Sequence, residues 1–372
     1  MPAHAASEQT AGLSPKAVRQ QVTIMKLREL SFTSFNLYNL NEAGLPIYSD
    51  TNGWSVEEYA KKIDWTSFVL KVMEADVFGF QELWHKTSLE KAFTKAGLDK
   101  DFDLLVPGGH AGQKIVCAGA ARKGLLVGEP EWITDFPDTF KLQSHGDDAQ
   151  TAEISVQIDK FSRPVLHFQI EPRDDREPIH VFVCHFKSKG PTKIFREGWY
   201  RDDKEKYKNH TEAIGASLST IRRTAEATAL RLILTEITKK TDTPVIVLGD
   251  INDGVHSNTL NILGGQPRYL TGLSSGGADT DLYTAQVLQT YRSERDVYYT
   301  HVFQGTRESL DQILVSQEFY DNSRRRIWSF DGLIVNNDHL NTDDHKANGT
   351  NDHGIIRAAF KYKPAKDKSE TA

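Results

Sequence analysis

Short apolar runs alternate with polar, turn-forming segments along most of the chain. Runs rich in β-branched and aromatic residues predict strands, whereas apolar positions three and four residues apart predict helices. The expected helix 56–75 has an apolar face made of Tyr59, Ile63, Phe68, Val69 and Val72. Further helices are expected at 89–96, ended by Gly97, and at 220–237. The expected strands are 29–38, 77–80, 154–158, 165–170, 179–184, 245–248, 312–315 and 355–360.

Many short strands with few helices between them favour an α/β fold, in which two mixed sheets pack face to face with helices outside. No internal repeat and no Gly/Ser-rich linker divides the chain. We therefore expect a single domain at 27–363. A small, polar leader at 1–26 would precede it, and a charged tail at 364–372 would follow.

The composition is that of an ordinary globular protein, with 38% hydrophobic and 26% charged residues. The mean hydropathy is −0.49 and no apolar stretch approaches about 18 residues, so we expect no membrane span. The N-terminus lacks a basic-then-apolar export signal. We expect a cytoplasmic monomer, or a secreted one whose signal has been removed. Cys117 and Cys184 lie in apolar, strand-like contexts and are expected to be buried free thiols.

Polar residues recur where apolar strands end. In the run 245–253, a buried strand ends in Gly249 and is followed by Asp250 and Asn252, which share a face because they are two residues apart. Taken alone, this pattern also fits an ordinary strand-to-turn cap. A site built from the ends of strands in both sheets explains the whole set of such residues, which comprises Asn36, Glu82, His185, Asp250, Asn252, Asp311, Asp352 and His353.

These residue types suit the cleavage of a phosphate ester, which needs a cation, a positioned water and donors around the phosphorus. Glu82 is a candidate ligand for Mg²⁺, which binds through one or two carboxylates and keeps several waters. A cationic His185 could contact a phosphate oxygen, with Lys187 adding charge. Asp311 could orient His353 and raise its pKa. The ordinary alternatives are that Glu82 is exposed to solvent, that His185 is hydrogen-bonded to the backbone, and that Asp311 caps the start of a strand.

Two Asn-Asp-His triplets could supply the histidine that Asp311 orients. The triplet ending in His353 leads directly into Gly354 and an apolar strand. The triplet ending in His339 follows a strand and opens a polar stretch with Asp343, Asp344 and His345. We expect the second triplet to be catalytic and the first to form a surface loop, with an accessory metal site as the alternative.

The segment 187–223 carries ten Lys/Arg against five Asp/Glu, in a chain whose net charge is −6. Aromatic residues are interleaved with these cations, which is typical of a surface that follows a polyanion. The alternative is a solvated loop. The candidate substrate contacts are Lys187, Lys193 and Arg196, and the interleaved rings are Phe195, Trp199, Tyr200 and Tyr207.

Taken in order, these motifs resemble the endonuclease/exonuclease/phosphatase superfamily, over about residues 28–362. Each motif is short, but six occur in order with plausible spacing. The resemblance implies a four-layer α/β sandwich and a phosphoesterase that uses Mg²⁺ or Mn²⁺. The matching motifs are Ser34-Phe35-Asn36, Gln81-Glu82, His185, Gly249-Asp250-Ile251-Asn252, Leu310-Asp311-Gln312-Ile313-Leu314 and Asn351-Asp352-His353.

By this resemblance Glu82 binds the metal, with Asn36 beside it and Asp352 contributing. The chain departs from the family at two positions. Asn351 stands where a serine is usual, which we expect to change little. Tyr38 stands where abasic-site endonucleases carry an acidic residue, which argues against a repair enzyme.

The resemblance also assigns catalytic roles. Asp250 would orient or deprotonate the attacking water, and Asn252 would hold the scissile phosphate. His353, held by Asp311, and His185 would stabilise the transition state.

The substrate is left open by the resemblance, because one fold serves many phosphate esters. The basic, aromatic segment favours a nuclease that hydrolyses DNA phosphodiester bonds. The alternative is a phosphodiesterase or phosphatase acting on a small-molecule or lipid phosphoester. A non-catalytic binding module is disfavoured, because every expected catalytic position is filled.

Overall fold

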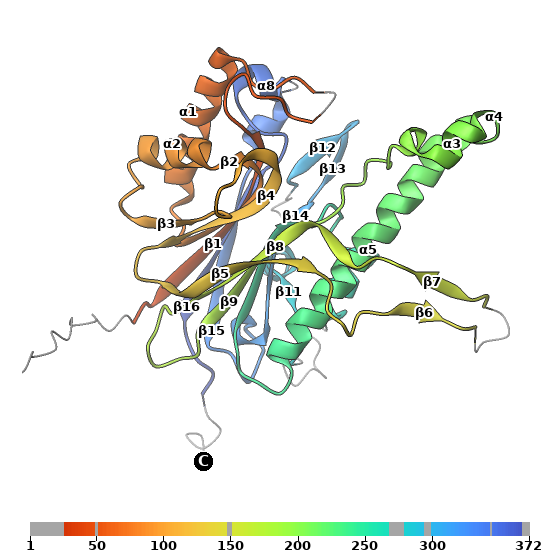
Figure 1. Ribbon diagram of the computed structural model, residues 1–372. Helices are drawn as coiled ribbons and strands as arrows, with labels where there is room; N and C mark the ends of the chain where they lie inside the picture. Colours follow the sequence, from red (N-terminus) through yellow and green to blue (C-terminus); the bar gives the residue numbers. More distant parts are fainter. Residues whose placement is uncertain are drawn as a thin grey trace, which may run out of the picture.

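Two six-stranded mixed sheets form the centre of the computed structural model (Figure 1). The structure describes residues 26–48, 51–146, 151–267, 279–293, 299–342 and 344–366. The first sheet has the order β15 (Trp328–Asn336), β16 (Ile355–Tyr362), β1 (Glu29–Leu40), β2 (Val77–His85), β4 (Ala111–Arg122) and β3 (Phe102–Leu105). The second has the order β11 (Tyr283–Thr284), β14 (Asp311–Val315), β10 (Val245–Asp250), β9 (Ile179–His185), β8 (Lys160–Ile170) and β5 (Leu126–Asp135).

Helices cover the outer face of each sheet. The helices α1 (Val56–Met73) and α2 (Lys86–Ala96) share one apolar cluster with strands of the first sheet. The helices α5 (Thr211–Thr238) and α6 (Asn258–Gly264) share another with strands of the second. The order helix, sheet, sheet, helix is the predicted four-layer sandwich. Shorter helices are α3 (Gly198–Asp202), α4 (Lys204–Tyr207), α7 (Ala285–Thr290) and α8 (His345–Asn348), with 3₁₀ turns η1 (Ile194–Arg196), η2 (Lys208–His210), η3 (Gln317–Phe319) and η4 (Asp338–Asn341).

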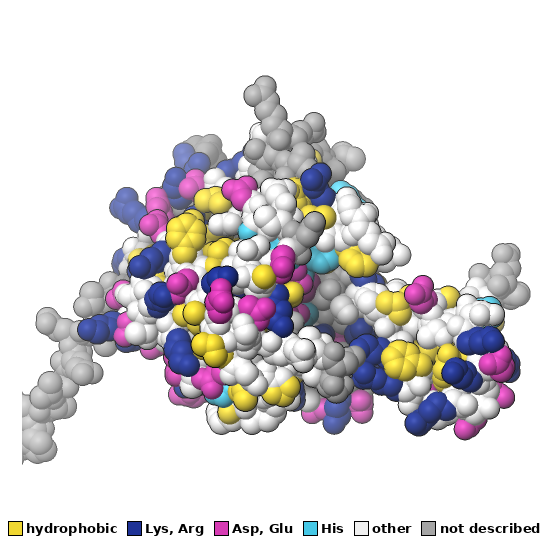
Figure 2. Space-filling model, turned by 90° about the horizontal axis from the view of Figure 1, so that it is seen from above, with side chains coloured by type: hydrophobic (Ala, Val, Ile, Leu, Met, Phe, Trp, Pro, Cys, Tyr) yellow, Lys and Arg dark blue, Asp and Glu magenta, His cyan; other side chains and the backbone are white. Residues whose placement is uncertain are grey.

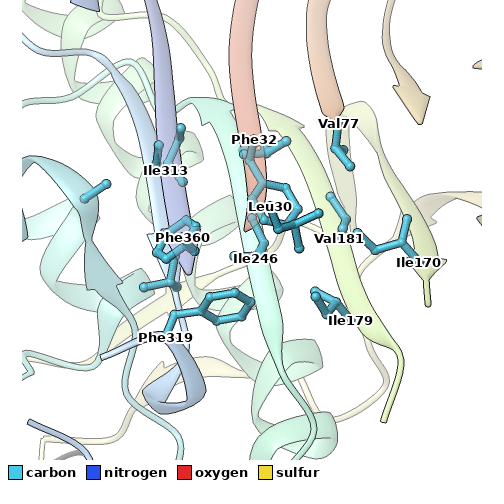
Figure 3. Packing of buried hydrophobic residues seen from close by; sticks show 14 of the residues in the cluster. Leu30, Phe32, Val77, Ile170, Ile179, Val181, Ile246, Ile313, Phe319 and Phe360 are labelled. Atoms are coloured by element: carbon cyan, nitrogen blue, oxygen red, sulfur yellow. The ribbon is translucent and has the colours of Figure 1, made fainter. Parts of the chain in front are cut away.

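The apolar core between the sheets is drawn from their facing sides (Figure 3). Phe32 and Phe360 of the first sheet pack against Val181, Ile246 and Ile313 of the second, and all five are buried. Such burial removes water from both inner faces and holds the sheets at a fixed separation. The polar ends of strands in opposite sheets are therefore held near one another.

Two hairpins and one helical projection extend from this frame. The hairpins are β6–β7 (Leu142–Ser144, Ile154–Val156) and β12–β13 (His301–Phe303, Thr306–Glu308). The N-terminal half of α5 runs away from the sheets and carries α3 and α4 at its end (Figure 1). We call residues 191–222, which include η1, α3, α4, η2 and this half of α5, the arm.

The expected strands all occur, most of them longer than predicted, and Gly97 ends α2 with a left-handed backbone, φ 73°. Cys117 and Cys184 are buried and free. Helix α5 begins at Thr211, nine residues before the predicted start. The prediction for helix α1 was wrong at two positions, because Phe68 and Val72 are 60% and 51% exposed. The buried face of α1 follows residues 63, 66, 70 and 73, which turns positions 68 and 72 outward.

None of the helices in the described part of the chain is long and apolar enough to cross a membrane. Residues 1–25 and 367–372, which hold most of the predicted leader and tail, lie outside the described residues.

The carboxyl group of Glu318, in the 3₁₀ turn η3 after β14, is buried and should affect stability. Glu318 is 1% exposed and accepts a hydrogen bond from Ser316 Oγ at 2.6 Å. Burial raises the pKa of Glu318 from 4.5 to about 7. The folded state thus keeps a proton that the unfolded chain releases, so the free energy of unfolding falls as the pH rises from about 4.5 to about 7. At about 1.4 kcal/mol per pKa unit, this fall is about 3 kcal/mol.

Glu318→Gln should remove this part of the fall and make the variant more stable than wild type at about pH 8. Chemical denaturation at pH 5 to 8 measures the difference. Glu129→Gln, which changes an exposed glutamate on β5, should leave the profile unchanged. A Glu318→Gln profile parallel to that of wild type would contradict the assignment.

Candidate active site

The register of three neighbouring strands brings polar residues together at one edge of the second sheet. Asp250 pairs with His185 across the parallel strands β10 and β9, and with Asp311 across the antiparallel strands β10 and β14. In the first sheet, the regular pairing of the parallel strands β1 and β2 is interrupted after Asn36 and Gln81, next to Glu82. The two edges meet at a cleft of about 430 Å³ lined by Glu82, His185, Asp250, Asn252, Asp352 and His353, among others.

Asp250 contacts several of the other cleft residues and is 1% exposed. Its Oδ2 accepts a hydrogen bond from Asn36 Nδ2 at 3.2 Å, and its Oδ1 accepts one from the backbone N–H of Asn252 at 2.9 Å. His185 Nε2 lies 3.4 Å and His353 Nε2 lies 3.8 Å from Oδ2. Burial raises the pKa of Asp250 to about 7, against the opposing effect of the His353 charge.

The sequence Gly-Asp-x-Asn follows from local geometry. A Cβ at Gly249 would lie 2.6 Å from the carbonyl oxygen of Cys184, so only glycine lets β10 pack this closely against β9. Asn252 has a left-handed backbone, φ 56°, and its Nδ2 donates to the carbonyl of Phe186 at 3.0 Å. Glu82 is also left-handed, φ 60°. Such strained conformations cluster at functional sites, where the surrounding contacts maintain them.

His353 is held by Asp311. Its Nδ1 lies 2.8 Å from Asp311 Oδ2, and Asp311 is completely buried. Burial disfavours a charged imidazole, but the carboxylates of Asp311 and Asp250 outweigh it and raise the pKa of His353 well above its usual value. This raised pKa favours the imidazolium form of His353.

The pKa of His185 is shifted in the opposite direction. Burial lowers its pKa well below the usual value, and the positive charges of Arg163 and His353 lower it further. This direction does not favour the cationic His185 suggested by the sequence, and its contact with a phosphate stays a prediction. A neutral imidazole can still donate through Nε2, which lies 3.4 Å from Asp250 Oδ2 and 3.8 Å from Glu82 Oε1.

Two carboxylates in the cleft fit a divalent metal. Burial raises the pKa of Glu82, and the charge of Asp352 raises it further, so two negative groups share a poorly solvated space. The Oδ1 atom of Asp352 is buried and has no hydrogen-bond partner among the described residues. A hard cation would satisfy both groups. Ligand atoms of Asp352, His301 and His353 also lie within 4.8 Å of one another.

Asn36 is less free to bind a metal than the carboxylates are. Its Oδ1 accepts a hydrogen bond from the backbone N–H of Tyr38 at 2.9 Å, and its Nδ2 donates to Asp250. One lone pair of Oδ1 is left for a ligand bond.

The three predicted substrate contacts lie apart from the catalytic group. Lys187 is half-buried, and its Nζ donates to Ser188 Oγ and to the carbonyl of Gly190. Lys193 and Arg196 are exposed on the arm. Figure 2 shows this face from above, with Lys and Arg side chains (dark blue) gathered on the lobe at the right, where α3 and α4 lie.

The structure adds cleft residues that no motif indicated. Arg163 on β8 lines the cleft, and its Nη1 donates to the carbonyl of Phe186 at 3.3 Å. The ring of His301 lies 4.9 Å from that of His353. Tyr48 also lines the cleft, as does Lys189, which belongs to the basic segment 187–223. These residues lie on a strand edge, a hairpin and loops, so no strand-end pattern marks them.

The first Asn-Asp-His triplet is more than a surface loop. Asp338 is exposed, as expected, but His339 Nε2 lies 2.8 Å from the carbonyl oxygen of His353. The ring of His339 packs against Trp65 at 4.9 Å. His339 of the first triplet thus holds the backbone of His353 in the second. Asp343 lies outside the described residues, Asp344 caps α8, and His345 Nδ1 lies 3.2 Å from Thr350 Oγ1.

Comparisons with known proteins agree with this architecture. An endonuclease/exonuclease/phosphatase family protein from Bacteroides thetaiotaomicron superposes with a TM-score of 0.50 at 15% identity, over 90% of this chain and 98% of that one. Truncated Caenorhabditis elegans TDP2 superposes with a TM-score of 0.50 at 12% identity, over 90% and 98%. A Bacteroides thetaiotaomicron mannosyl-6-phosphatase gives 0.50 at 14%, over 90% and 100%. At these identities the likeness concerns the fold.

The sequence comparisons address the family directly. A comparison with curated proteins finds no match. The model of the Endonuclease/Exonuclease/phosphatase family matches residues 33–335, and the resemblance inferred from the motifs is thereby confirmed. The chain belongs to the endonuclease/exonuclease/phosphatase family, whose members hydrolyse phosphate esters.

Proposed function

We propose that this protein is a phosphodiesterase that requires Mg²⁺ or Mn²⁺ and hydrolyses DNA. The observation that carries the proposal is the continuity of the cleft with the arm. Ser188, Lys189, Gly190 and Pro191 line the cleft, and the chain continues from them directly into the arm. A polymer whose phosphate occupies the cleft would therefore pass over exposed cations and rings.

Glu82 and Asp352 would hold the cation, with the amide oxygen of Asn36 beside them. When bound, the cation supplies a Lewis acid for a phosphate oxygen. Asp250 would take the proton of the attacking water, because a pKa of about 7 suits a base that works near neutral pH. Its carboxylate is oriented by Asn36 and by the backbone of Asn252.

The remaining residues would stabilise charge on the phosphate. The imidazolium of His353, held by Asp311, places a positive charge at the cleft wall. His185 and Asn252 supply neutral N–H donors. Preorganised donors and charges of this kind stabilise the transition state without rearrangement.

The charge on the arm supports a moderate attraction for DNA. Seven Lys/Arg lie on residues 191–222 against five Asp/Glu. The other cations of the 187–223 segment, Lys187, Lys189 and Arg223, lie at the base of the arm. Lys189 pairs with Glu308 at 2.7 Å, and Arg223 pairs with Asp253 at 3.4 Å.

A second candidate substrate is an amphiphilic phosphoester. The arm exposes apolar side chains beside its cations: Phe195 at 49%, Trp199 at 44%, Leu218 at 43% and Ile221 at 42%. Such a surface would also suit the acyl chains and headgroup of a lipid. A panel of plasmid, single-stranded DNA, RNA, inositol phosphates, sphingomyelin and bis-p-nitrophenyl phosphate, each with Mg²⁺, Mn²⁺ or EDTA, separates the two candidates. Preference for the lipid would overturn the DNA proposal.

Glu82→Gln should lower hydrolysis of bis-p-nitrophenyl phosphate at least about a hundredfold, because the metal loses its main carboxylate ligand. Affinity for Mn²⁺ should fall in parallel, measured by electron paramagnetic resonance. Glu90→Gln on α2 makes the same chemical change outside the cleft and serves as the control. Unaltered Mn²⁺ affinity in Glu82→Gln would show that the metal binds elsewhere.

His353→Ala should lower kcat by about 10²- to 10⁴-fold, the range for a positioned electrostatic or acid–base group. His339→Ala should lower it by about tenfold or less, because the hydrogen bond of His339 reaches the backbone of His353 and not its imidazole ring. Steady-state rates on the small bis-ester compare the two. A larger loss in His339→Ala would assign catalysis to the first triplet.

Substituting Gln at all four of Lys193, Arg196, Lys204 and Lys208 should raise KM for DNA. The salt dependence of binding should also become shallower, by about 0.9 in the log–log slope for each phosphate that the arm no longer neutralises. Turnover of the bis-ester should hardly change.

The matched control is the same exchange at four exposed lysines on the side of α1 and α2, namely Lys71, Lys95, Lys100 and Lys123. Equal losses on DNA and on the bis-ester would mean that the arm shapes the cleft and does not bind polymer.

A further inference from the structure

A lysine is buried completely beside the active site. Lys62 on α1 is 0% exposed, and its Nζ lies 5.6, 5.5 and 5.2 Å from the ring centres of Tyr38, Trp54 and Trp65. Among the described residues, its hydrogen bonds go to Thr350 and Asn351, and none of the ion pairs within 4.0 Å involves it. Burying an ammonium group is unfavourable unless its hydrogen bonds compensate. The partners of Lys62 therefore indicate what the group does.

Both hydrogen-bond partners of Lys62 belong to the loop that carries Asp352 and His353. Lys62 Nζ donates to the carbonyl of Thr350 at 3.1 Å and to the side-chain oxygen of Asn351. The loop lies directly on the helix, because a Cβ at Gly349 would come within 2.5 Å of the backbone nitrogen of Lys62.

Asn351 connects this loop to the first sheet. It is completely buried, and its Nδ2 donates to the backbone carbonyl of Asn36. The side chain of Asn36 in turn donates to Asp250. One continuous set of hydrogen bonds thus runs from Lys62 through Asn351 and Asn36 to the proposed base.

The chemistry of the amide explains why asparagine occupies position 351. An amide carries an acceptor and a donor on separate atoms, so it can bind Lys62 with one and Asn36 with the other. A serine hydroxyl is shorter and places both functions on one oxygen. The expectation that Asn351 in place of serine changes little therefore does not match its contacts.

We propose that Lys62 is a positioning residue for phosphoester hydrolysis, which acts through Asn351 to hold the Asp352–His353 loop and Asn36 in register. The inference rests on the proposed function. Lys62 touches neither the cleft nor the substrate, so its effect is on the placement of the residues that do.

Lys62→Met keeps the length of the side chain and removes its donor. It should lower kcat on bis-p-nitrophenyl phosphate by about 10- to 100-fold with little change in KM, because misplacing catalytic groups affects turnover more than binding. Lys61→Met is the control, since Lys61 is the adjacent, exposed lysine and donates to the carbonyl of Ala347 at 3.2 Å. Equal kcat values in wild type and a folded Lys62→Met would overturn the proposal.

Asn351→Ser tests the same link if Lys62→Met does not fold. It should also lower kcat about tenfold or more. An unchanged kcat in a folded Asn351→Ser would overturn the proposal. Where Lys62→Met does fold, the two losses should not multiply in the double variant Lys62→Met/Asn351→Ser, because both substitutions break one chain of contacts. Losses that multiply would mean that the two residues act independently and would overturn the proposal.

Mn²⁺ binding gives a readout that does not depend on turnover. Affinity measured by electron paramagnetic resonance should weaken in Lys62→Met and stay at the wild-type value in Lys61→Met, since Asp352 and Asn36 flank the hydrogen bonds that the substitution removes. Unchanged affinity in a folded Lys62→Met would count against the proposal. A wild type that binds Mn²⁺ but hydrolyses no phosphoester would instead reject the proposed function, leaving the effect on Mn²⁺ affinity as the test of positioning.

Discussion

The hydrogen bond between Asn36 and Asp250 joins the two sheets at their active edge, and the rest of the site depends on it. Each sheet supplies about half of the polar groups, so the cleft exists only while the sheets keep their relative position. The apolar core between them provides that rigidity, because close-packed side chains leave little room for sliding. A substitution that disturbs this core would therefore also displace Asp250 relative to Glu82.

The charges in the cleft are balanced by neighbours more than by solvent. His185 and His353 both lie within 4 Å of Asp250, yet the pKa of His185 is lowered and that of His353 is raised. The difference arises because His353 has a buried carboxylate at 2.8 Å, whereas His185 faces the positive charge of Arg163. Two chemically identical side chains thus differ in pKa because their neighbours in the cleft differ.

The structure changes the interpretation of the segment 187–223. From composition this segment is a single basic stretch, but in the fold it has two parts. Arg223 and Lys189 pair with acidic residues at the base, while Lys193, Arg196 and the exposed rings project on the arm. The surface offered to a substrate is therefore less cationic and more apolar than the sequence suggested, which is why an amphiphilic phosphoester remains a second candidate.

Local sequence was enough to predict eight of the strands, the four-layer arrangement and the polar residues at the strand ends, but it did not predict strands such as β3 and β15. Each strand-end residue, such as Asp250 or His185, follows its own apolar run, and parallel register then brings these ends to one edge. The outward side of α1 was not predictable from spacing alone, since Phe68 and Val72 are as apolar as the buried positions. The support that His339 gives to His353, and the bond from Lys62 to a residue 289 positions away, arise only when distant segments pack together. No local pattern marks such contacts, because the partner of a polar side chain is chosen by the fold and not by its sequence neighbours.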